Sequence, residues 1–296
     1  MAFDLWHTGG QGGGTILPMN EIPPLNAANL LKRHGLRADK SLGQNFLQDP
    51  LALEKIASVA EINSTDTVLE VGPGLGSLTR YLAASAREVV AVELDEKLLP
   101  PLKAVIAPYP NVRLIHGDIL KISPSEMVNQ PGYLVVANIP YYITSAIIRH
   151  LLENEPKPRR IVLTVQKEVA DRICAKPGDM SLLALSVQVY GKPRITARIP
   201  AGAFFPTPKV DSVVLCLEVY PDPEIKNELL NIFFKLIKAG FSQKRKTLRN
   251  SLSSGLHIAP IHAVDLLTKA NIEPQRRAET LSIPEWQRLC ELFEKK

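Results

Sequence analysis

Hydrophobic and polar positions along the first two thirds of the chain predict β-strands that alternate with helices. Short runs of β-branched and aliphatic residues are typical of strands buried in a parallel sheet. After the first run, Leu78, Tyr81 and Leu82 recur at helical spacing, which predicts a helix over residues 77–86. This alternation favours an α/β fold built on a mostly parallel sheet. The expected strands are residues 67–71, 88–93, 112–115, 133–137 and 160–166.

The last third of the chain changes its pattern. Two more strands are expected at 194–199 and 212–219, which brings the predicted sheet to seven strands. Pro206 and Pro208 predict a rigid loop rather than a strand over residues 203–211. After a proline-rich linker at 220–223, only helical spacing remains, with helices expected over 224–239, 243–252, 261–270 and 284–294.

The domain organisation follows from these patterns. The first residues are rich in Gly, Pro and small polar residues and lack the features of a signal peptide, so they are expected to be disordered. We therefore expect a disordered leader over 1–26, an α/β domain over 27–220 and a small all-helical domain over 221–296.

Composition and charge narrow the class of protein. With 45% hydrophobic and 22% charged residues, the 296-residue chain is predicted to be soluble and globular. Three scattered cysteines without a CxxC pair favour neither a disulfide framework nor a zinc site, and predict a cytoplasmic location. Residues 186–296 hold 17 Lys and Arg against 11 Asp and Glu, within a net charge of +5. This basic segment suggests RNA or DNA as a partner, although a merely well-solvated surface is the alternative.

A glycine-rich turn follows the first predicted strand. Gly72, Gly74 and Gly76 separate that strand from the next helix, an arrangement that lets a nucleoside approach the backbone. The third glycine comes one residue earlier than in the Gly-x-Gly-x-x-Gly fingerprint, and position 77 is Ser. The spacing therefore favours a nucleoside without a pyrophosphate and disfavours a dehydrogenase. The alternative is a glycine-rich turn that binds nothing.

Acidic residues lie at the carboxyl end of the next predicted strand and shortly after the one that follows it, where open α/β sheets bind ligands. Glu93 can accept hydrogen bonds from both ribose hydroxyls of a nucleoside, or it can simply precede a helix. Asp118 can bind an adenine amino group, or it can close a turn.

The fourth strand leads into the tetrapeptide Asn138-Ile139-Pro140-Tyr141. Adenine N6 is a poor nucleophile because its lone pair is delocalised into the ring. The side-chain oxygen of Asn138 and the carbonyl of Ile139 can hold the two N–H groups, which turns the lone pair toward an electrophilic methyl group. Pro140 stiffens the turn, and Tyr141 offers a face for a flipped base. An ordinary turn with a core tyrosine is the alternative.

A basic run lies in the predicted helical domain. Lys244, Arg245, Lys246 and Arg249 can reach phosphates, or they can form a solvated helix face.

Taken together, these motifs resemble the ribosomal RNA adenine dimethyltransferase family over about residues 27–290. The resemblance is greatest to its bacterial members that modify two adjacent adenines near the 3′ end of 16S rRNA. The matching segments are residues 42–47, 70–76, 92–95, 117–118, 138–141, 206–212 and 244–252. One departure is Tyr142, where the family usually has Asn.

The resemblance implies a Rossmann-like S-adenosylmethionine-dependent methyltransferase domain and a helical RNA-binding domain. It implies no metal, S-adenosylhomocysteine as product, 16S rRNA of the small ribosomal subunit or its precursor as partner, no membrane, and a monomer. Cofactor contacts are expected at Asn45, Leu47, Gly72, Gly74, Glu93, Asp118 and Asn138. The residues expected around the target adenine are Asn138, Ile139, Pro140, Tyr141 and Phe204. RNA contacts are expected at Lys209, Lys244, Arg245, Lys246 and Arg249.

Two alternative functions remain at this point. One is a sister enzyme that dimethylates a 23S rRNA adenine and confers antibiotic resistance, which the Pro208-Lys209-Val210-Asp211 segment and the basic domain disfavour. The other is a non-enzymatic relative that binds nucleic acid as a transcription factor does, which Glu93, Asp118 and the tetrapeptide disfavour.

Overall fold

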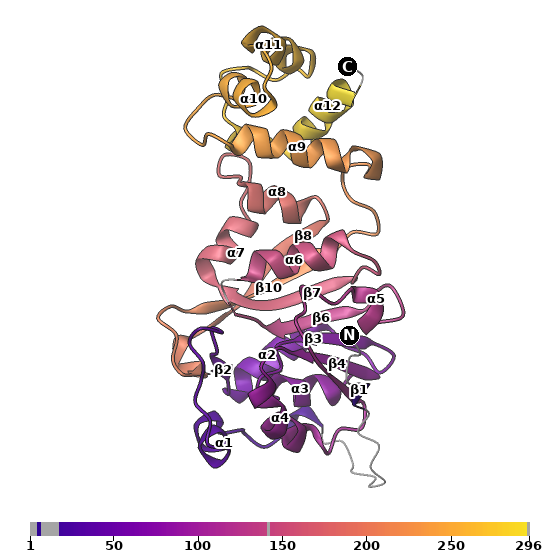
Figure 1. The fold of residues 1–296 in the computed structure, drawn as a ribbon, viewed down its shortest axis with the longest axis vertical. Helices are drawn as coiled ribbons and strands as arrows, with labels where there is room; N and C mark the ends of the chain where they lie inside the picture. Colours follow the sequence, from indigo (N-terminus) through magenta and orange to yellow (C-terminus); the bar gives the residue numbers. More distant parts are fainter. Residues whose placement is uncertain (1–4, 7–17, 141–142, 295–296) are drawn as a thin grey trace. The chain divides into compact units, whose positions relative to one another are not determined.

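The computed structural model describes residues 5–6, 18–140 and 143–294. The chain divides into two compact units (Figure 1). The first comprises the chain up to residue 170 together with residues 194–219, and the second comprises residues 171–193 and the chain from residue 220 onward. The return to the second unit at 220 falls at the expected linker, but residues 171–193, which we had expected in the α/β domain, also lie in the second unit.

A mostly parallel sheet forms the centre of the first unit, which confirms the predicted Rossmann-like fold. The strand order is β1-β5-β4-β3-β6-β7-β10-β8, in which β3 to β7 pair in parallel and β10 is antiparallel to β7. Seven strands were expected, and β1 at the edge is an addition. The strands are β1 (Leu5–Trp6), β3 (Thr67–Val71), β4 (Glu88–Glu93), β5 (Val112–His116), β6 (Leu134–Asn138), β7 (Arg160–Gln166), β8 (Gly191–Ile199) and β10 (Ser212–Val219).

Helices cover this sheet, so the central strands are buried along most of their length. At the start of helix α2 the Asp49 side chain accepts the Ala52 N–H at 2.8 Å, and Pro50 stands at the first helical position. It packs against α3 and strands β6 and β7 (Figure 1). The helices that begin in this unit are α1 (Ala27–Arg33), α2 (Pro50–Ala60), α3 (Ser77–Ala83), α4 (Leu99–Ile106), α5 (Pro124–Met127), α6 (Thr144–Glu153) and α7 (Lys167–Ile173).

A two-stranded ribbon corrects the loop prediction for residues 203–211. Strand β9 (Phe204–Phe205) pairs antiparallel with β2 (Phe46–Leu47). The two phenylalanines precede the first proline, so their backbones are free to pair, and Pro206 then ends the strand. The Gln48 N–H also donates to the Ala203 carbonyl at 3.0 Å, which extends the contact.

Part of the expected leader is ordered against the first unit. Residues 1–4 and 7–17 lie outside the described residues, but β1 pairs with β5 and Ile22 is buried in the main core. Arg80 on α3 donates to the Pro23 carbonyl at 2.8 Å. The expectation of disorder over all of 1–26 is therefore wrong for these residues, because apolar Ile22 and a buried guanidinium fix the chain.

The second unit is helical, as predicted, with a core that includes Phe233 and Trp286. Helix α9 contacts α8, α10 and α12. Helix α10 begins at Leu248 rather than at the expected residue 243, so Lys244, Arg245 and Lys246 lie in the turn before it. The helices are α8 (Leu182–Gln188), α9 (Leu230–Phe241), α10 (Leu248–Leu256), α11 (Pro260–Lys269) and α12 (Ile283–Glu294). None of the helices in the described part of the chain is long and apolar enough to span a membrane.

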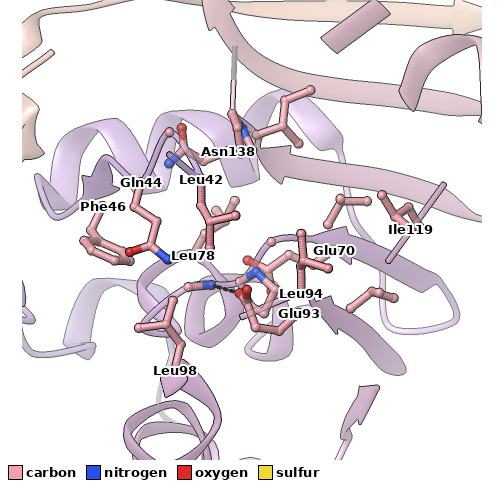
Figure 2. A pocket seen from close by; sticks show the side chains of 18 of the residues that line it. Leu42, Gln44, Phe46, Glu70, Leu78, Glu93, Leu94, Leu98, Ile119 and Asn138 are labelled. Carbon is pink, nitrogen blue, oxygen red and sulfur yellow. Dashed lines mark hydrogen bonds between the residues drawn. The ribbon is translucent and has the colours of Figure 1, made fainter. Parts of the chain in front are cut away.

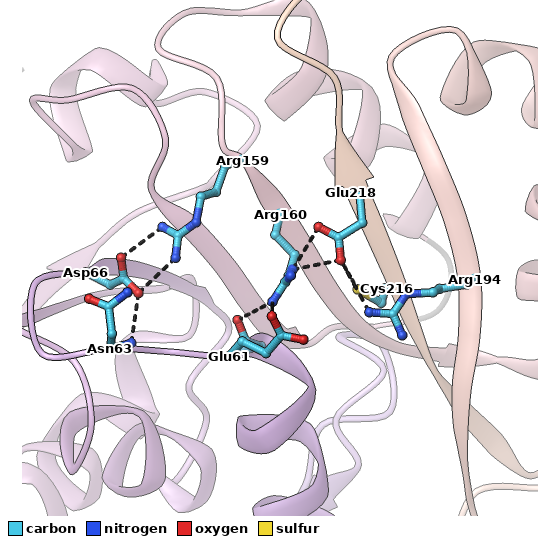
Figure 3. Close-up of polar contacts among 9 residues, drawn as sticks. Glu61, Asn63, Asp66, Arg159, Arg160, Arg194, Cys216 and Glu218 are labelled. Atoms are coloured by element: carbon cyan, nitrogen blue, oxygen red, sulfur yellow. Dashed lines mark hydrogen bonds and ion pairs between the residues drawn. The ribbon is translucent and has the colours of Figure 1, made fainter.

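Two neighbouring arginines tie strand β7 to the elements beside it (Figure 3). Arg159 binds both carboxylate oxygens of Asp66 at 2.9 Å, in the turn before β3. Arg160 pairs with Glu218 on β10 and with Glu61 at the end of α2, each at 2.9 Å. Burial alone would raise the pKa of Asp66, but the hydrogen bonds and charge of Arg159 lower it overall. This pair therefore fixes the strands whose other ends form the site.

The Asp66–Arg159 pair is expected to stabilise the fold. A double-mutant cycle of Asp66→Asn and Arg159→Gln in urea unfolding should give a coupling energy of about 0.5–3 kcal/mol at neutral pH. Because the folded pKa of Asp66 is lowered, this stability is present above about pH 3.9 and is lost as the pH falls through the lowered pKa. The exposed pair Asp265–Lys269 serves as control, and its coupling energy should be about 0.5 kcal/mol or less. Equal couplings for the two pairs would contradict the expectation.

Candidate functional site

A cavity lies at the carboxyl ends of β3, β4, β5 and β6, the edge where open parallel sheets bind ligands. Its empty volume is about 1020 Å³, including the space open to solvent. Figure 2 shows Glu70 and Glu93 near one another and Asn138 above them in that view. The residues that line it are 42–47, 70–75, 77, 78, 92–94, 98, 117–119, 138–140 and 143.

The glycine turn after β3 forms one wall of the cavity. Gly72 and Gly74 have φ angles of +67° and +59°, which L side chains rarely adopt. A Cβ added to Gly74 would also lie 3.0 Å from the ring of Phe46, so a side chain there would force that ring to shift. A Cβ added to Gly72 would meet nothing within 4 Å, so the turn has free space at that glycine, where a ligand is predicted to approach.

Glu93 ends β4 with its carboxylate directed back to this turn. Its two oxygens accept the Gly74 N–H at 2.9 Å and the Asp95 N–H at 2.8 Å. Burial raises the pKa of Glu93, and the backbone N–H groups oppose that rise. Each carboxylate oxygen keeps a further lone pair that can accept a ligand hydroxyl.

Glu70 is a second buried carboxyl group in the wall, on β3. Its side chain is 1% exposed, and neither oxygen has a hydrogen-bond partner among the described residues. Burial raises the pKa of Glu70 to about 8; the nearby Thr79 hydroxyl opposes this rise, and the negative charge of Glu93 adds to it. A buried carboxyl group without a partner is costly, and a cationic group in the cavity would offset that cost.

Residues 42–47 form the opposite wall and are held by Gln44. The Gln44 side chain donates to the Asp95 carboxylate at 2.7 Å and accepts the Asp39 N–H at 2.8 Å. Asn45 and Leu47 of this segment line the cavity, as expected. Asp118 lines it from the end of β5, where its carboxylate accepts the Leu120 N–H at 3.1 Å.

Asn138 ends β6 and is oriented by the same wall. Its side-chain amide donates to the Asn45 carbonyl at 3.0 Å, which leaves Oδ1 as the atom that can accept a hydrogen bond. Ile139 and Pro140 line the cavity beside it. The expected stacking residue Tyr141, and the departure at Tyr142, lie outside the described residues.

The structure brings together all seven expected cofactor contacts, but not all the other predicted residues. Phe204 does not line the cavity: its side chain is 2% exposed, because β9 directs it into the main core. Its place beside the target adenine therefore stays a prediction, which would need the Phe204 side chain to leave the core. Lys209, Lys244, Arg245 and Lys246 are exposed, whereas Arg249 is half-buried.

Glu70 and Gln44 belong to the site although no role was predicted for either. The sequence signal for Glu70 is an acidic residue within an otherwise apolar strand, whereas Gln44 lies in a polar segment without a distinctive signal. Across residues 5–6, 18–140 and 143–294, no group of three or more His, Cys, Asp and Glu side chains is arranged to hold a metal ion.

Comparison with known proteins gives a consistent set of relatives. A family model described as ribosomal RNA adenine dimethylase matches residues 35–295. A protein of Dehalococcoides mccartyi (strain CBDB1) named ribosomal RNA small subunit methyltransferase A is 50% identical over 266 residues, which cover 89% of this chain and 91% of that protein. Its namesake from Alkaliphilus metalliredigens (strain QYMF) is 41% identical and covers 90% of this chain and 95% of its own length.

Two solved structures share most of the fold. A dimethyladenosine transferase from Plasmodium falciparum has a TM-score of 0.73 and 27% identity, over 84% of this chain and 98% of that one. The 23S rRNA methyltransferase ErmE has a TM-score of 0.67 and 29% identity, over 84% of this chain and 100% of that one.

The unpartnered carboxyl group of Glu70 is expected to change how stability depends on pH. The unfolded carboxyl group loses its proton near pH 4.3, whereas the folded one keeps it to about pH 8. Between those values the unfolded state binds fewer protons, so wild-type stability should fall by about 1.4 kcal/mol per pH unit relative to Glu70→Gln. Urea unfolding of both proteins from pH 4 to 9 measures this difference. Parallel stability curves would show that the folded carboxyl group is already ionised.

Proposed function

The chain belongs to the ribosomal RNA adenine dimethylase family, and from this premise we propose that it transfers methyl groups from S-adenosylmethionine to N6 of two adjacent adenines in the 3′-terminal hairpin of 16S rRNA. The observation that carries the proposal is a single cavity lined by all seven expected cofactor contacts, with Asn138, Ile139 and Pro140 in the same wall. The products are dimethylated adenines and S-adenosylhomocysteine, formed as the small subunit matures in the cytoplasm by a monomeric enzyme.

The residues present fit a cationic nucleoside cofactor. Glu70 places two unpartnered oxygens in the cavity wall, where a positive charge would stabilise them. Glu93 would bind the ribose hydroxyls and Asp118 the adenine of the cofactor. Gly72, Gly74 and the Asn45–Leu47 segment would hold its methionine end. S-adenosylmethionine supplies an electrophilic methyl group when bound, and no metal ion is required for that chemistry.

Asn138 has the geometry to orient the amine of the target adenine. Its amide group is fixed on the Asn45 carbonyl, so Oδ1 is preorganised to accept one N–H of the amine. The carbonyl of Ile139 would accept the other, and Pro140 would restrain the turn that carries both. Holding both N–H groups turns the nitrogen lone pair out of conjugation. Positioning and this acceptor pair would supply most of the rate.

The substrate proposal is supported by the names of the relatives and by exposed cations. Proteins that share 41% and 50% identity with the chain are named for the small ribosomal subunit, whereas the relative that acts on 23S rRNA shares 29%. In the second unit, Lys244, Arg245 and Lys246 form an exposed basic turn that can bind phosphates. Methyl transfer to unmodified small subunits but not to large subunits would test the choice of substrate. The absence of transfer to either would favour a non-enzymatic role.

Asn138→Ala is expected to lower the rate of the chemical step. The lost acceptor is needed chiefly when the amine turns its lone pair outward, so the loss should fall on kcat, by about 10²–10³-fold. Single-turnover methylation of unmodified small subunits, at saturating S-adenosylmethionine and RNA, measures that step. Asn111→Ala is a control, because Asn111 bonds the Ala83 and Ala86 carbonyls and does not line the cavity. If Asn138→Ala transfers its first methyl group at the wild-type rate, the proposed role is wrong.

Replacing Lys244, Arg245, Lys246 and Arg249 with Gln is expected to weaken RNA binding and its salt dependence. Each lost phosphate contact should remove about 0.9 from the log–log slope of affinity against salt on duplex RNA, by analogy with B-DNA. Arg249 is half-buried and donates to the side chain of Asn250. A triple variant that keeps Arg249 should therefore lose nearly as much RNA affinity and salt dependence as the quadruple variant. Filter binding across a salt series measures the slope. An unchanged slope would show that the turn is only a solvated surface.

A further inference from the structure

A second group of cations lies in the first unit, around the end of α1. Lys32, Arg33, Arg37 and Lys40 are all exposed, and none has an ion pair among the described residues. The carboxylate of Asp39, the acidic residue within this segment, is bound by the Ser41 hydroxyl at 2.6 Å and the Ser41 N–H at 2.8 Å. The segment over residues 32–40 therefore presents an excess of positive charge to solvent.

Two of these cations, Lys32 and Arg37, line a hollow whose other lining residues are mostly apolar, which we call the basic hollow. Its empty volume is about 990 Å³, including the space open to solvent. Lys32 and Arg37 line it on the side of α1, and Phe205 and Pro206 line it on the side of β9. The remaining lining residues are Ala28, Leu31, Gly35, Leu36 and Ala38. An exposed cationic rim around an aromatic ring is the combination that binds single-stranded nucleic acid.

The basic hollow shares a structural element with the candidate active site. Phe46 lines the cavity, and its antiparallel partner across the ribbon is Phe205, which lines the basic hollow. Both phenylalanines belong to one apolar cluster with Leu31 of α1 and Leu75 of the glycine turn. The β2–β9 ribbon is thus a wall common to the cavity and the basic hollow.

Helix stabilisation explains only part of this charge. Lys32 and Arg33 lie in the last turn of α1, where cations interact favourably with the helix dipole. Arg37 and Lys40 lie beyond the helix, where that effect has decayed. Neither does helix stabilisation explain why Phe205 is left partly exposed beside Arg37.

We propose that the basic hollow binds an unpaired nucleotide of the rRNA substrate next to the target adenine, with its phosphates on Lys32 and Arg37 and its base against Phe205. This assignment rests on the proposed function for the identity of the RNA. It adds an RNA contact in the first unit to the basic turn of the second unit. A protein segment with acidic residues is the alternative occupant, which the test separates.

The test compares two variants with the same loss of charge. Lys32→Gln with Arg37→Gln should raise the KM for unmodified small subunits and lower the salt slope by about 1.4, at 0.7 per single-strand phosphate contact. The kcat at saturating RNA and the affinity for S-adenosylmethionine should stay at wild-type values. Lys55→Gln with Lys192→Gln removes two exposed cations elsewhere and should leave the KM unchanged.

The aromatic contact has its own pair of variants. Phe205→Leu keeps the backbone pairing with Phe46 but removes the ring, and should raise the KM on the order of tenfold. Phe205→Tyr keeps the ring and should restore the wild-type KM. If Phe205 only supported the ribbon that carries Phe46, Phe205→Leu would instead lower the affinity for the cofactor.

Two outcomes would overturn the proposal. One is a KM and salt slope for Lys32→Gln with Arg37→Gln equal to those of the control variant. The other is that Lys32→Gln with Arg37→Gln loses binding to poly-L-glutamate while its binding of small-subunit rRNA stays unchanged. If the wild-type protein transfers no methyl group to small subunits, the proposed function fails, and the salt slope for binding the rRNA still decides the role of the basic hollow.

Discussion

The two hydrogen bonds that Glu93 accepts hold the site together. They tie the end of β4 to the glycine turn at Gly74 and to the backbone of Asp95. Asp95 in turn accepts the side chain of Gln44, which positions the Asn45 carbonyl, and that carbonyl holds the amide of Asn138. A continuous series of contacts therefore runs round the cavity, from the strand that would hold the cofactor ribose to the residue that would hold the amine.

This series explains how weak local preferences produce a precise site. Neither Gln44 nor Asn45 belongs to a long element, and β2 beside them has two residues. Their geometry comes from neighbours far away in sequence: Asp95 is 51 residues from Gln44, and Asn138 is 93 residues from Asn45. Preorganisation of this kind allows the Asn138 oxygen to act without reorganising during the reaction. Glu93 would thus serve the fold and the cofactor together, because its bonds to the turn leave lone pairs for a ligand.

The strands and the candidate cofactor contacts were largely predictable from the sequence. Buried strands carry a local signal, so the bounds of β3, β4, β7 and β10 agree with prediction. A pairing between two short segments far apart in the sequence leaves no such local signal. Strand β9 was missed because two prolines follow it, and the burial of Phe204 depends on which face of β9 packs against the core. The start of α10 and the anchoring of Pro23 by Arg80 likewise depend on tertiary contacts.

The cofactor and the RNA that the protein is proposed to bind would meet side chains of opposite charge at different places. The cavity wall contains two buried carboxyl groups, Glu70 and Glu93, whose raised pKa values a cation in the cavity would lower and a phosphate would raise further. The cations of residues 32–40 and 244–246 lie at exposed positions, where they can attract a polyanion. An RNA strand would therefore keep its phosphates on the outside and could place only an uncharged base in the cavity. Base flipping satisfies both requirements, because it moves a neutral adenine to the carboxyl ends of the strands and leaves the backbone on the basic surface.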